Sequence, residues 1–456
     1  MHTLRIFGAA LICGLAFATA SAADNADDVN RMEQAVSSQF ASGAFMGSVL
    51  VARGNVTLLA KGYGDADIQR HVPNSPTTKF RLGSVTKQFT AAAILLLQER
   101  GKLRVEDPVK KYLPEAPAAW DQITIFNLLT HTSGIPNFTS FPDYRETESK
   151  PTTPAELVAR FRDKPLDFPP GRQFRYSNSG YALLGYLIEK VSGQTYQRFL
   201  QDHIFKTLRM QDSGYDSNTQ VIENRATGYS PGPDGRPTPA GYIDMTIPYA
   251  AGGLYSTVED LLRWERALYG GKLLSAASLK QMTTPFKDNY AFGLFVAAES
   301  DGTQVMGHGG GIEGFNTALA YVPSQQLAIV VLANLNGATP EDLSNELKRI
   351  ALHLPAKPPA PGGEAALRQR IAELAAGKPD YSHYGEQLGN VTRQQLPKLQ
   401  EIYSELGAVQ KVEFQYASGD IDVYRVTYEH GKGLHRFHLA PDGKMTWAAF
   451  QRLPAS

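Results

Sequence analysis

The chain has 456 residues, and its 45 lysines and arginines balance 45 aspartates and glutamates, so the formal net charge is zero. This balance argues against nucleic acid and anionic membranes as partners, because both recruit concentrated basic charge. With 42% hydrophobic and 20% charged residues, the composition is that of a soluble globular protein long enough for more than one domain.

The first 22 residues have the pattern of a secretory signal peptide. Arg5 supplies the positive charge, residues 6–18 are apolar, and Ala20-Ser21-Ala22 fits a cleavage site. The apolar stretch is shorter than the roughly 20 residues of a membrane-spanning helix, so we expect no stable membrane anchor. Cys13 is the only cysteine and leaves with this segment. The sequence therefore predicts a periplasmic or secreted protein without disulfides.

The next part of the chain predicts a sheet built from both of its ends. Alternating apolar runs on either side of Arg53-Gly54-Asn55 indicate a β-hairpin, and an apolar helix follows Ser84. Residues 123–274 are mostly helix and loop. Strand patterns return at residues 290–300, 303–310 and 317–334. We expect an α/β (α+β) fold in which one mostly antiparallel sheet is flanked by helices and the helical region is inserted into it.

A Pro/Gly linker at residues 355–363 is the clearest domain boundary. It separates a main domain, residues 23–354, from a small α+β domain, residues 364–456. In the small domain, helical segments at 366–376 and 393–406 precede three strand-like runs, the last with a turn at Asp442-Gly443. The sequence does not decide whether this domain covers the active site, dimerises or binds a wall polymer. Its aromatic residues are spaced as the core face of a sheet: Phe414, Tyr416, Tyr424, Tyr428, Phe437, Trp447 and Phe450.

Ser84 and Lys87 form a Ser-x-x-Lys pair at a strand-to-helix junction. Residues three apart share a helix face, so the lysine can act as base for the serine if burial lowers its pKa. The nearby N–H groups of the helix start can stabilise an oxyanion. Alone, this pair is as well explained by a helix cap and a surface lysine. The pair occurs once in the chain, at this junction, which favours a nucleophile and its base.

A second motif, Tyr176-Ser177-Asn178, precedes an apolar helix that starts near Gly180. The tyrosine can exchange a proton with Lys87, and the asparagine can donate to and accept from a substrate amide. By itself this motif is better explained by a core aromatic followed by a helix cap. It lies, however, in the inserted helical region, where the second wall of a cleft is expected.

The third motif is the glycine-rich run from Gly307 to Thr317. Gly309 to Gly314 matches G-x-G-x-x-G, but a dinucleotide site needs a helix after the glycines and here a strand follows. A strand edge without side chains, which a substrate backbone can approach, is the better interpretation. His308 would then be a polar or partly cationic contact beside it. A glycine-rich bulge with an incidental histidine is the alternative.

Three motifs in this order, Ser-x-x-Lys, Tyr-x-Asn and His-x-Gly, resemble the serine β-lactamase-related hydrolase family. That family includes class C β-lactamases, D-alanyl-D-alanine carboxypeptidases, D-aminopeptidases and β-lactamase-like esterases. Further segments in family order strengthen the resemblance, which extends over about residues 35–354: "FRLGSVTKQFTAAAI", "LLTHTSGIP", "PPGRQFRYSNSGYALLGYLIE", "GGLYSTVEDLLRW" and "VVLAN".

The resemblance implies a role for each motif residue. Ser84 would be the nucleophile that forms an acyl-enzyme, and Lys87 and Tyr176 would share the general-base and general-acid work. Asn178 would hold the substrate amide. The N–H groups of Ser84 and Gly311, next to the triplet His308-Gly309-Gly310, would form the oxyanion hole. His131, in another family segment, is expected to be structural.

One departure from class C β-lactamases matters. They carry Lys-Thr-Gly in the third motif, whereas here it is His308-Gly309-Gly310, and a histidine with an ordinary pKa is mostly neutral at pH 7. We therefore expect a peptidase or esterase that acts on a small-molecule or peptide substrate, such as a cell-wall peptide, more than an efficient β-lactamase.

The alternatives are a penicillin-recognising sensor or scaffold with little turnover, and a β-lactamase. No metal or cofactor is expected, because the sequence has neither H-E-x-x-H nor a tight His/Asp cluster. The oligomeric state stays open.

Overall fold

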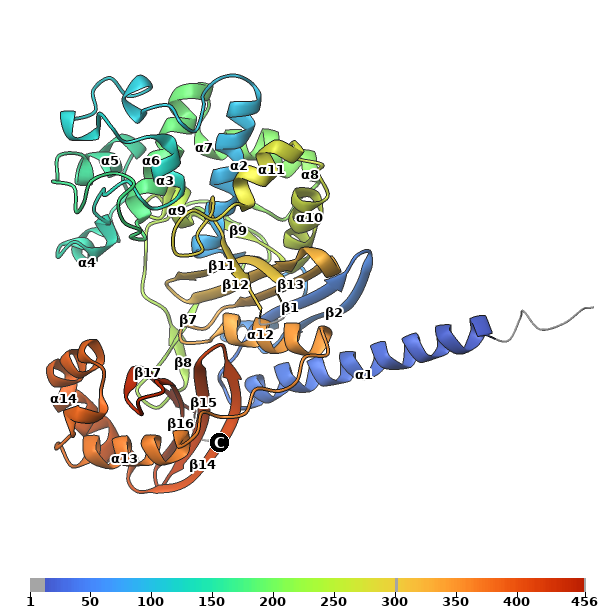
Figure 1. Cartoon of the computed structure of the whole chain (residues 1–456), viewed down its shortest axis with the longest axis vertical. Helices are drawn as coiled ribbons and strands as arrows, with labels where there is room; N and C mark the ends of the chain where they lie inside the picture. Colours follow the sequence, from blue (N-terminus) through green and yellow to red (C-terminus); the bar gives the residue numbers. More distant parts are fainter. Residues whose placement is uncertain (1–12, 300–301, 455–456) are drawn as a thin grey trace, which may run out of the picture.

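The computed structural model describes residues 13–299 and 302–454. A six-stranded antiparallel sheet lies at its centre, in the order β10-β11-β12-β13-β1-β2 (Figure 1). β1 pairs with β13, with Val49 opposite Val331, which confirms that strands from both ends of the region form one sheet. The strands are β1 (Gly47–Arg53), β2 (Val56–Tyr63), β10 (Phe295–Ala298), β11 (Gln304–Ile312), β12 (Phe315–Val322) and β13 (Leu327–Ala333).

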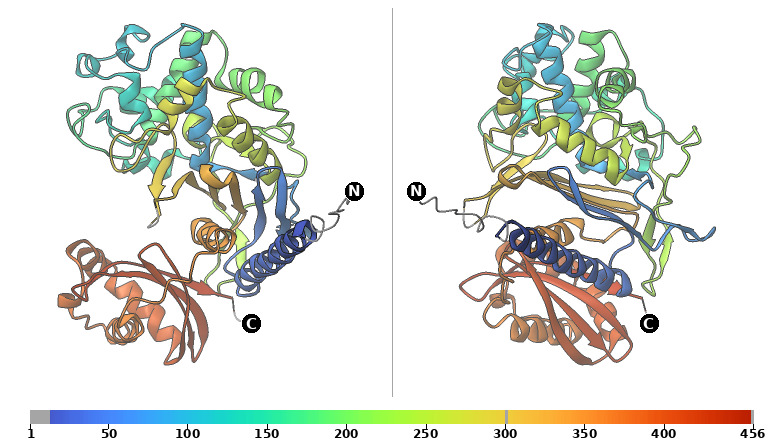
Figure 2. Two further views of the ribbon diagram at one scale, coloured as in Figure 1. Left: turned by 45° about the vertical axis from the view of Figure 1, so that its right-hand side comes forward. Right: turned by 90° about the vertical axis from the view of Figure 1, so that its right-hand side faces the viewer.

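Neighbouring residues of the central strands face two separate hydrophobic cores, because successive side chains of a strand point to opposite faces. Val49 and Val331 pack in one core with α1 (Cys13–Ala41) and α12 (Pro340–Ala351). Leu50 and Val330 pack in the other core, with the helical region. The sheet is thus the middle of three layers, with the helical region on one face and α1 and α12 on the other (Figures 1 and 2).

The chain between β2 and β10 forms the helical region and several short strands. One of these, β5, is the strand that the sequence predicts before the Ser84 helix, and it pairs with β9, which the sequence analysis did not predict. The helices of this part of the chain are α2 (Thr86–Glu99), α3 (Ile125–Leu129), α4 (Tyr144–Thr147), α5 (Pro154–Arg162), α6 (Asn178–Ser192), α7 (Tyr196–Leu200), α8 (Lys206–Leu208), α9 (Tyr249–Gly252), α10 (Val258–Tyr269) and α11 (Ala276–Thr283). The short strands are β3 (Asp65–Asp67), β4 (Val72–Pro73), β5 (Phe80–Arg81), β6 (Gly214–Tyr215), β7 (Tyr229–Pro231), β8 (Pro237–Pro239) and β9 (Leu254–Ser256).

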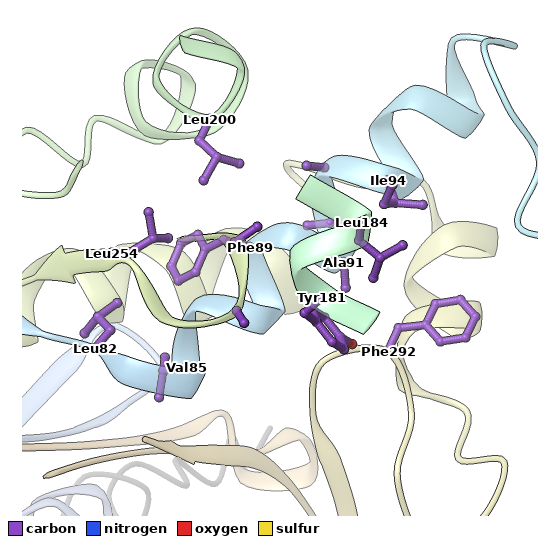
Figure 3. Close-up of a cluster of buried hydrophobic side chains, with 14 of the residues drawn as sticks. Leu82, Val85, Phe89, Ala91, Ile94, Tyr181, Leu184, Leu200, Leu254 and Phe292 are labelled. Atoms are coloured by element: carbon purple, nitrogen blue, oxygen red, sulfur yellow. The ribbon is translucent and has the colours of Figure 1, made fainter. Parts of the chain in front are cut away.

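Helix α2 is buried on every side from Thr86 to Leu97. A helix that is hydrophobic all round belongs in a core rather than on a surface. Phe89 and Ala91 of α2 lie in one cluster with Tyr181 and Leu184 of α6 (Figure 3). This packing joins the helix that carries Lys87 to the helix that begins at Asn178.

Two predicted element boundaries are wrong. The strand expected at 290–300 is confined to β10, because Asp288, Asn289 and Gly293 have positive φ and turn the chain before it. Helix α14 (Glu386–Leu406) begins well before the predicted position 393.

Part of the predicted signal peptide, residues 1–12, lies outside the described residues, and α1 begins at Cys13. None of the described helices combines the length and apolarity needed to cross a membrane.

Beyond the linker, two helices cover a four-stranded antiparallel sheet. The sheet has four strands rather than three because the last of the three predicted runs contains two strands, joined by the Asp442-Gly443 turn. Trp447 was expected in its core but is 47% exposed. A bulge opposite His438 and Leu439 shifts the register there, so Met445 is buried while Trp447 faces solvent. The elements are α13 (Gly363–Ala375), α14, β14 (Val409–Ser418), β15 (Ile421–Tyr428), β16 (Gly431–Leu439) and β17 (Met445–Leu453).

This C-terminal unit packs on the face of the molecule formed by α1 and α12. Arg436 Nε lies 3.4 Å from a carboxylate oxygen of Asp342 on α12, and Gln39 of α1 donates to the Tyr416 hydroxyl at 3.2 Å. We propose that the domain boundary lies at residues 355–363, where the chain crosses between the two units.

Candidate active site

Ser84 lies in a 3₁₀ turn, Gly83–Val85, between β5 and α2. The preceding residue, Gly83, has φ +52°, which favours glycine, and a Cβ there would lie 2.8 Å from the Gly311 nitrogen. The tight turn therefore brings the half-buried Ser84 against strand β11, at the wall of a cleft.

Lys87 is completely buried and reaches Ser84, as its spacing predicts. Its Nζ lies 2.9 Å from Ser84 Oγ, 2.9 Å from Asn178 Oδ1 and 2.8 Å from the Ala251 carbonyl oxygen. Burial lowers the Lys87 pKa well below its ordinary value, because the amine loses its water.

Lys87 Nζ is placed to donate to all three oxygens. When the amine is neutral, its two N–H groups can keep the contacts with Asn178 and Ala251 while its lone pair accepts from the Ser84 hydroxyl. This arrangement suits a general base that takes the serine proton. The surface lysine that the sequence left as an alternative is excluded by the burial of Lys87.

Tyr176 and Asn178 reach the same place from the start of α6. The Tyr176 hydroxyl lies beside Ser84, and Lys87 Nζ lies 4.8 Å from the centre of the tyrosine ring. Burial raises the Tyr176 pKa, so the phenol keeps its proton at neutral pH. Asn178 lines the cleft, and its Nδ2 donates to Thr139 Oγ1 at 3.2 Å. The structure thus brings Ser84, Lys87, Tyr176 and Asn178 together.

His131 supports Tyr176 from behind. Its Nδ1 accepts from the Ser177 backbone N–H at 3.1 Å, and its ring centre lies 4.3 Å from that of Tyr176. Burial lowers the His131 pKa well below its ordinary value, so the ring is neutral. These contacts fit the structural role expected from the sequence.

The glycines of the third motif allow β11 to lie directly against the Ser84 turn. A Cβ on Gly310 would lie 2.1 Å from the Leu82 carbonyl oxygen and 3.1 Å from the Ser84 nitrogen. Gly311 lines the cleft beside Ser84. Ser84 and Gly311 therefore lie on two closely packed backbone segments that both line the cleft, as the oxyanion hole expected from the sequence requires.

His308 lies behind this wall and does not line the cleft. It is 7% exposed, its Nε2 is 3.2 Å from the Tyr290 hydroxyl, and its Nδ1 donates to the Gly309 carbonyl. Burial and then the nearby Lys87 lower its pKa to about 3. The partly cationic contact that the sequence suggested is therefore absent: this histidine is neutral and buried at neutral pH.

The cleft has a volume of about 390 Å³. It lies between the sheet edge and the helical region, and none of its described lining residues comes from the C-terminal domain. That domain, which could have covered the site, does not form part of it in this structure. The lining residues are Gly83, Ser84, Phe138, Thr139, Tyr144, Asn178, Ile243, Pro248, Ala251, Gly252, Gly311, Ile312, Glu313, Asn316 and Asn336.

Several of these residues were missed by the sequence analysis. The Ala251 carbonyl acts through its backbone, so no side-chain pattern reveals it. Asn336 accepts from the Gly314 N–H at 3.1 Å and so ties the tip of the β11–β12 hairpin to the cleft wall. Glu313 lies only two residues beyond Gly311 and could have been noticed as the charged member of the glycine-rich motif.

Replacing Gly310 by alanine tests the close approach of β11 to the Ser84 turn. The new Cβ would collide with backbone atoms, so the turn must move away from Gly311, and we expect kcat/KM to fall about 100-fold, since ångström-scale misplacement has effects of that order. Gly309→Ala is the matched control, because its Cβ would meet only the end of the exposed Glu341 side chain. Equal ester hydrolysis by the two variants would contradict this role.

Comparison with known proteins agrees with this geometry. The family model described as Beta-lactamase matches residues 30–353. The chain belongs to the Beta-lactamase family. It is 32% identical to a Bacillus subtilis (strain 168) protein named as a penicillin-binding protein, PbpX, over 70% of this chain and 78% of that protein. Against protein flp of Staphylococcus aureus the identity is 31%, and the match spans 63% of this chain and 59% of flp.

Solved structures show the same fold. A D-stereospecific amidohydrolase from Streptomyces sp. is 28% identical with a TM-score of 0.60, covering 70% of this chain and 97% of that one. An octameric penicillin-binding protein homologue from Pyrococcus abyssi, 24% identical with a TM-score of 0.65, covers 93% of this chain and 96% of its own. The part left uncovered by that second match is shorter than the C-terminal domain, so the similarity in fold continues beyond the linker.

Proposed function

We propose that this protein is an exported serine hydrolase that forms an acyl-enzyme on Ser84 and acts on D-amino-acid peptides or small esters. The observation that carries the proposal is the buried Lys87 amine, 2.9 Å from Ser84 Oγ. Membership of the family and the similarity to a D-stereospecific amidohydrolase support hydrolysis. The signal-peptide pattern of residues 1–22 supports export.

In the proposed acylation, Ser84 Oγ attacks the substrate carbonyl carbon and Lys87 Nζ takes the hydroxyl proton. The N–H groups of Ser84 and Gly311 stabilise the negative charge that develops on the carbonyl oxygen. Tyr176 donates its phenolic proton to the leaving group, and the proton held by Lys87 then restores the phenol. The raised pKa of Tyr176 and the lowered pKa of Lys87 favour this division into acid and base.

Asn178 is placed to orient the substrate. Its Oδ1 accepts from Lys87, and its Nδ2 donates to Thr139 at the cleft wall. We propose that a substrate amide hydrogen-bonds with this side chain. His308 would act through position alone, by filling the space behind Tyr176, whose ring centre is 6.0 Å from that of the histidine.

The rival function is a penicillin-recognising sensor with little turnover, which the name of the Bacillus subtilis relative favours. Efficient β-lactamase activity is disfavoured, because the third motif offers His308 as a neutral, buried group in place of a permanent cation.

The lifetime of the acyl-enzyme separates these functions. We expect continuous turnover of a p-nitrophenyl ester and a penicillin adduct that persists for many times the ester turnover time. A persistent ester adduct without turnover would identify a sensor, and rapid loss of the penicillin adduct with release of hydrolysed drug would identify a β-lactamase. Time-resolved intact-protein mass spectrometry measures both lifetimes on the same sample.

A further inference from the structure

The described lining of the cleft beside Ser84 includes one acidic residue and no basic one. The acidic residue is Glu313, whose side chain is 22% exposed. Lys87 is buried beneath Ser84 with a lowered pKa, and His308 is neutral behind the wall. A substrate in the cleft therefore meets one carboxylate and no lining cation.

Glu313 lines the same cleft as Ser84 and Gly311. It follows Ile312 at the turn of the β11–β12 hairpin, two residues after Gly311. Two residues span at most about 7 Å of backbone, so we expect the carboxylate to be within reach of a group a few bonds from the scissile carbonyl. The backbone of the turn is held by Asn336, which accepts from the Gly314 N–H.

The nearby cation does not neutralise Glu313. Nη1 of Arg145, on α4, lies 3.6 Å from Glu313 Oε1. The same nitrogen lies closer to the carboxylate of Glu148, at 3.1 Å from Oε1 and 3.3 Å from Oε2. One guanidinium thus faces two carboxylates. Arg145 is 77% exposed and does not line the cleft, so its pairing with Glu313 is weak and open to solvent.

From this arrangement, and on the basis of the proposed function, we infer that Glu313 is a specificity-determining residue that selects substrates with a positive charge near the scissile bond. A free α-ammonium would be favoured and a nearby carboxylate disfavoured. A D-amino-acid amide or an N-terminally free D-peptide fits this rule. A peptide whose leaving group is a free amino acid, with its carboxylate near the reacting carbonyl, does not.

Three substrates with one leaving group test the rule: D-phenylalanine p-nitroanilide, its N-acetyl derivative and its N-succinyl derivative, which are cationic, neutral and anionic. We expect kcat/KM to fall in that order. Glu313→Gln should lower the ratio of cationic to neutral substrate about tenfold, because it removes a charge a few ångströms from the ammonium. A structural role for Glu313 would lower both values together and leave the ratio unchanged, which would overturn the inference.

Glu146→Gln is the matched control, since it makes the same chemical change on α4 at an exposed position outside the cleft lining. It should leave the ratio at the wild-type value, and an equal fall in this variant would overturn the inference. For each variant, the ratio of kcat/KM for the cationic substrate to that for the neutral substrate is unaffected by a loss of activity that is common to both substrates.

A binding measurement distinguishes failure of this inference from failure of the proposed function. Calorimetry with benzylamine and benzoate needs no turnover, and wild-type protein should bind benzylamine at least tenfold more tightly, a preference that Glu313→Gln removes. If no substrate is turned over but this preference is found, the proposed function fails, and only the preference of the cleft for a cation at Glu313 stands. If the substrates are turned over and both the kinetic ratio and the binding preference are insensitive to Glu313, the inference fails alone.

Discussion

Replacing Ser84 by alanine is expected to lower kcat/KM for a p-nitrophenyl ester by about 10⁴-fold or more, because loss of the nucleophile leaves only binding and electrostatic stabilisation. The same change should abolish covalent labelling by penicillin. Ser84 is half-buried and the substitution removes one hydroxyl, so we expect unfolding free energy to change by about 1 kcal/mol or less. Steady-state kinetics and thermal unfolding measure the two effects.

Ser177, which lies between Tyr176 and Asn178 in the chain, gives the matched control for this change. Ser177→Ala removes a hydroxyl that donates to the Ile135 carbonyl at 3.1 Å, away from the reacting atoms. It should cost stability and reduce turnover far less than Ser84→Ala. If the Ser84 variant retained turnover within tenfold of wild type, the nucleophile would have to be another residue.

Replacing Lys87 by methionine is expected to lower kcat/KM about 10³-fold, since general-base catalysis contributes on the order of 10²–10⁴. Methionine keeps an unbranched apolar side chain, one atom shorter than that of lysine, and removes the amine that accepts the Ser84 proton. Lys102→Met, at an exposed position just beyond the same helix, should have no comparable effect. Full activity in Lys87→Met would contradict the proposed base.

The pH profile gives an independent view of Lys87. Only the neutral amine can take the serine proton, so kcat/KM should rise with pH through the Lys87 pKa, which lies well below its ordinary value. Activity is lost as pH falls and the amine is protonated. The His308 pKa of about 3 means that this histidine contributes no limb between pH 5 and 8. In Lys87→Met the rising limb should disappear, whereas a change in structure alone would lower the profile without altering its shape.

The sequence predicts the sheet and the meeting of the first two motifs for physical reasons. Apolar strand-like runs at both ends of the main domain, seen in the structure as β1 and β13, are most simply buried by pairing in one sheet. A spacing of three places Ser84 and Lys87 on one helix face whatever surrounds them. Such local rules hold because they depend on backbone geometry alone.

What the sequence could not predict depends on the surroundings of a side chain. The lowered pKa of Lys87 results from its complete burial, which only the folded chain supplies. His308 looked accessible in a glycine-rich strand, but the Gly309 carbonyl and Tyr290 hold it in the interior. Trp447 is exposed because of a bulge, and a bulge leaves little trace in an alternating pattern.

The most direct test of the account is to locate the covalent bond. Protein exposed briefly to a penicillin is digested, and the modified peptide is sequenced by tandem mass spectrometry. We predict a single acyl group on Ser84, absent from Ser84→Ala and formed far more slowly in Lys87→Met. An acyl group on any other residue, or no adduct together with no ester turnover, would contradict the proposed acyl-enzyme.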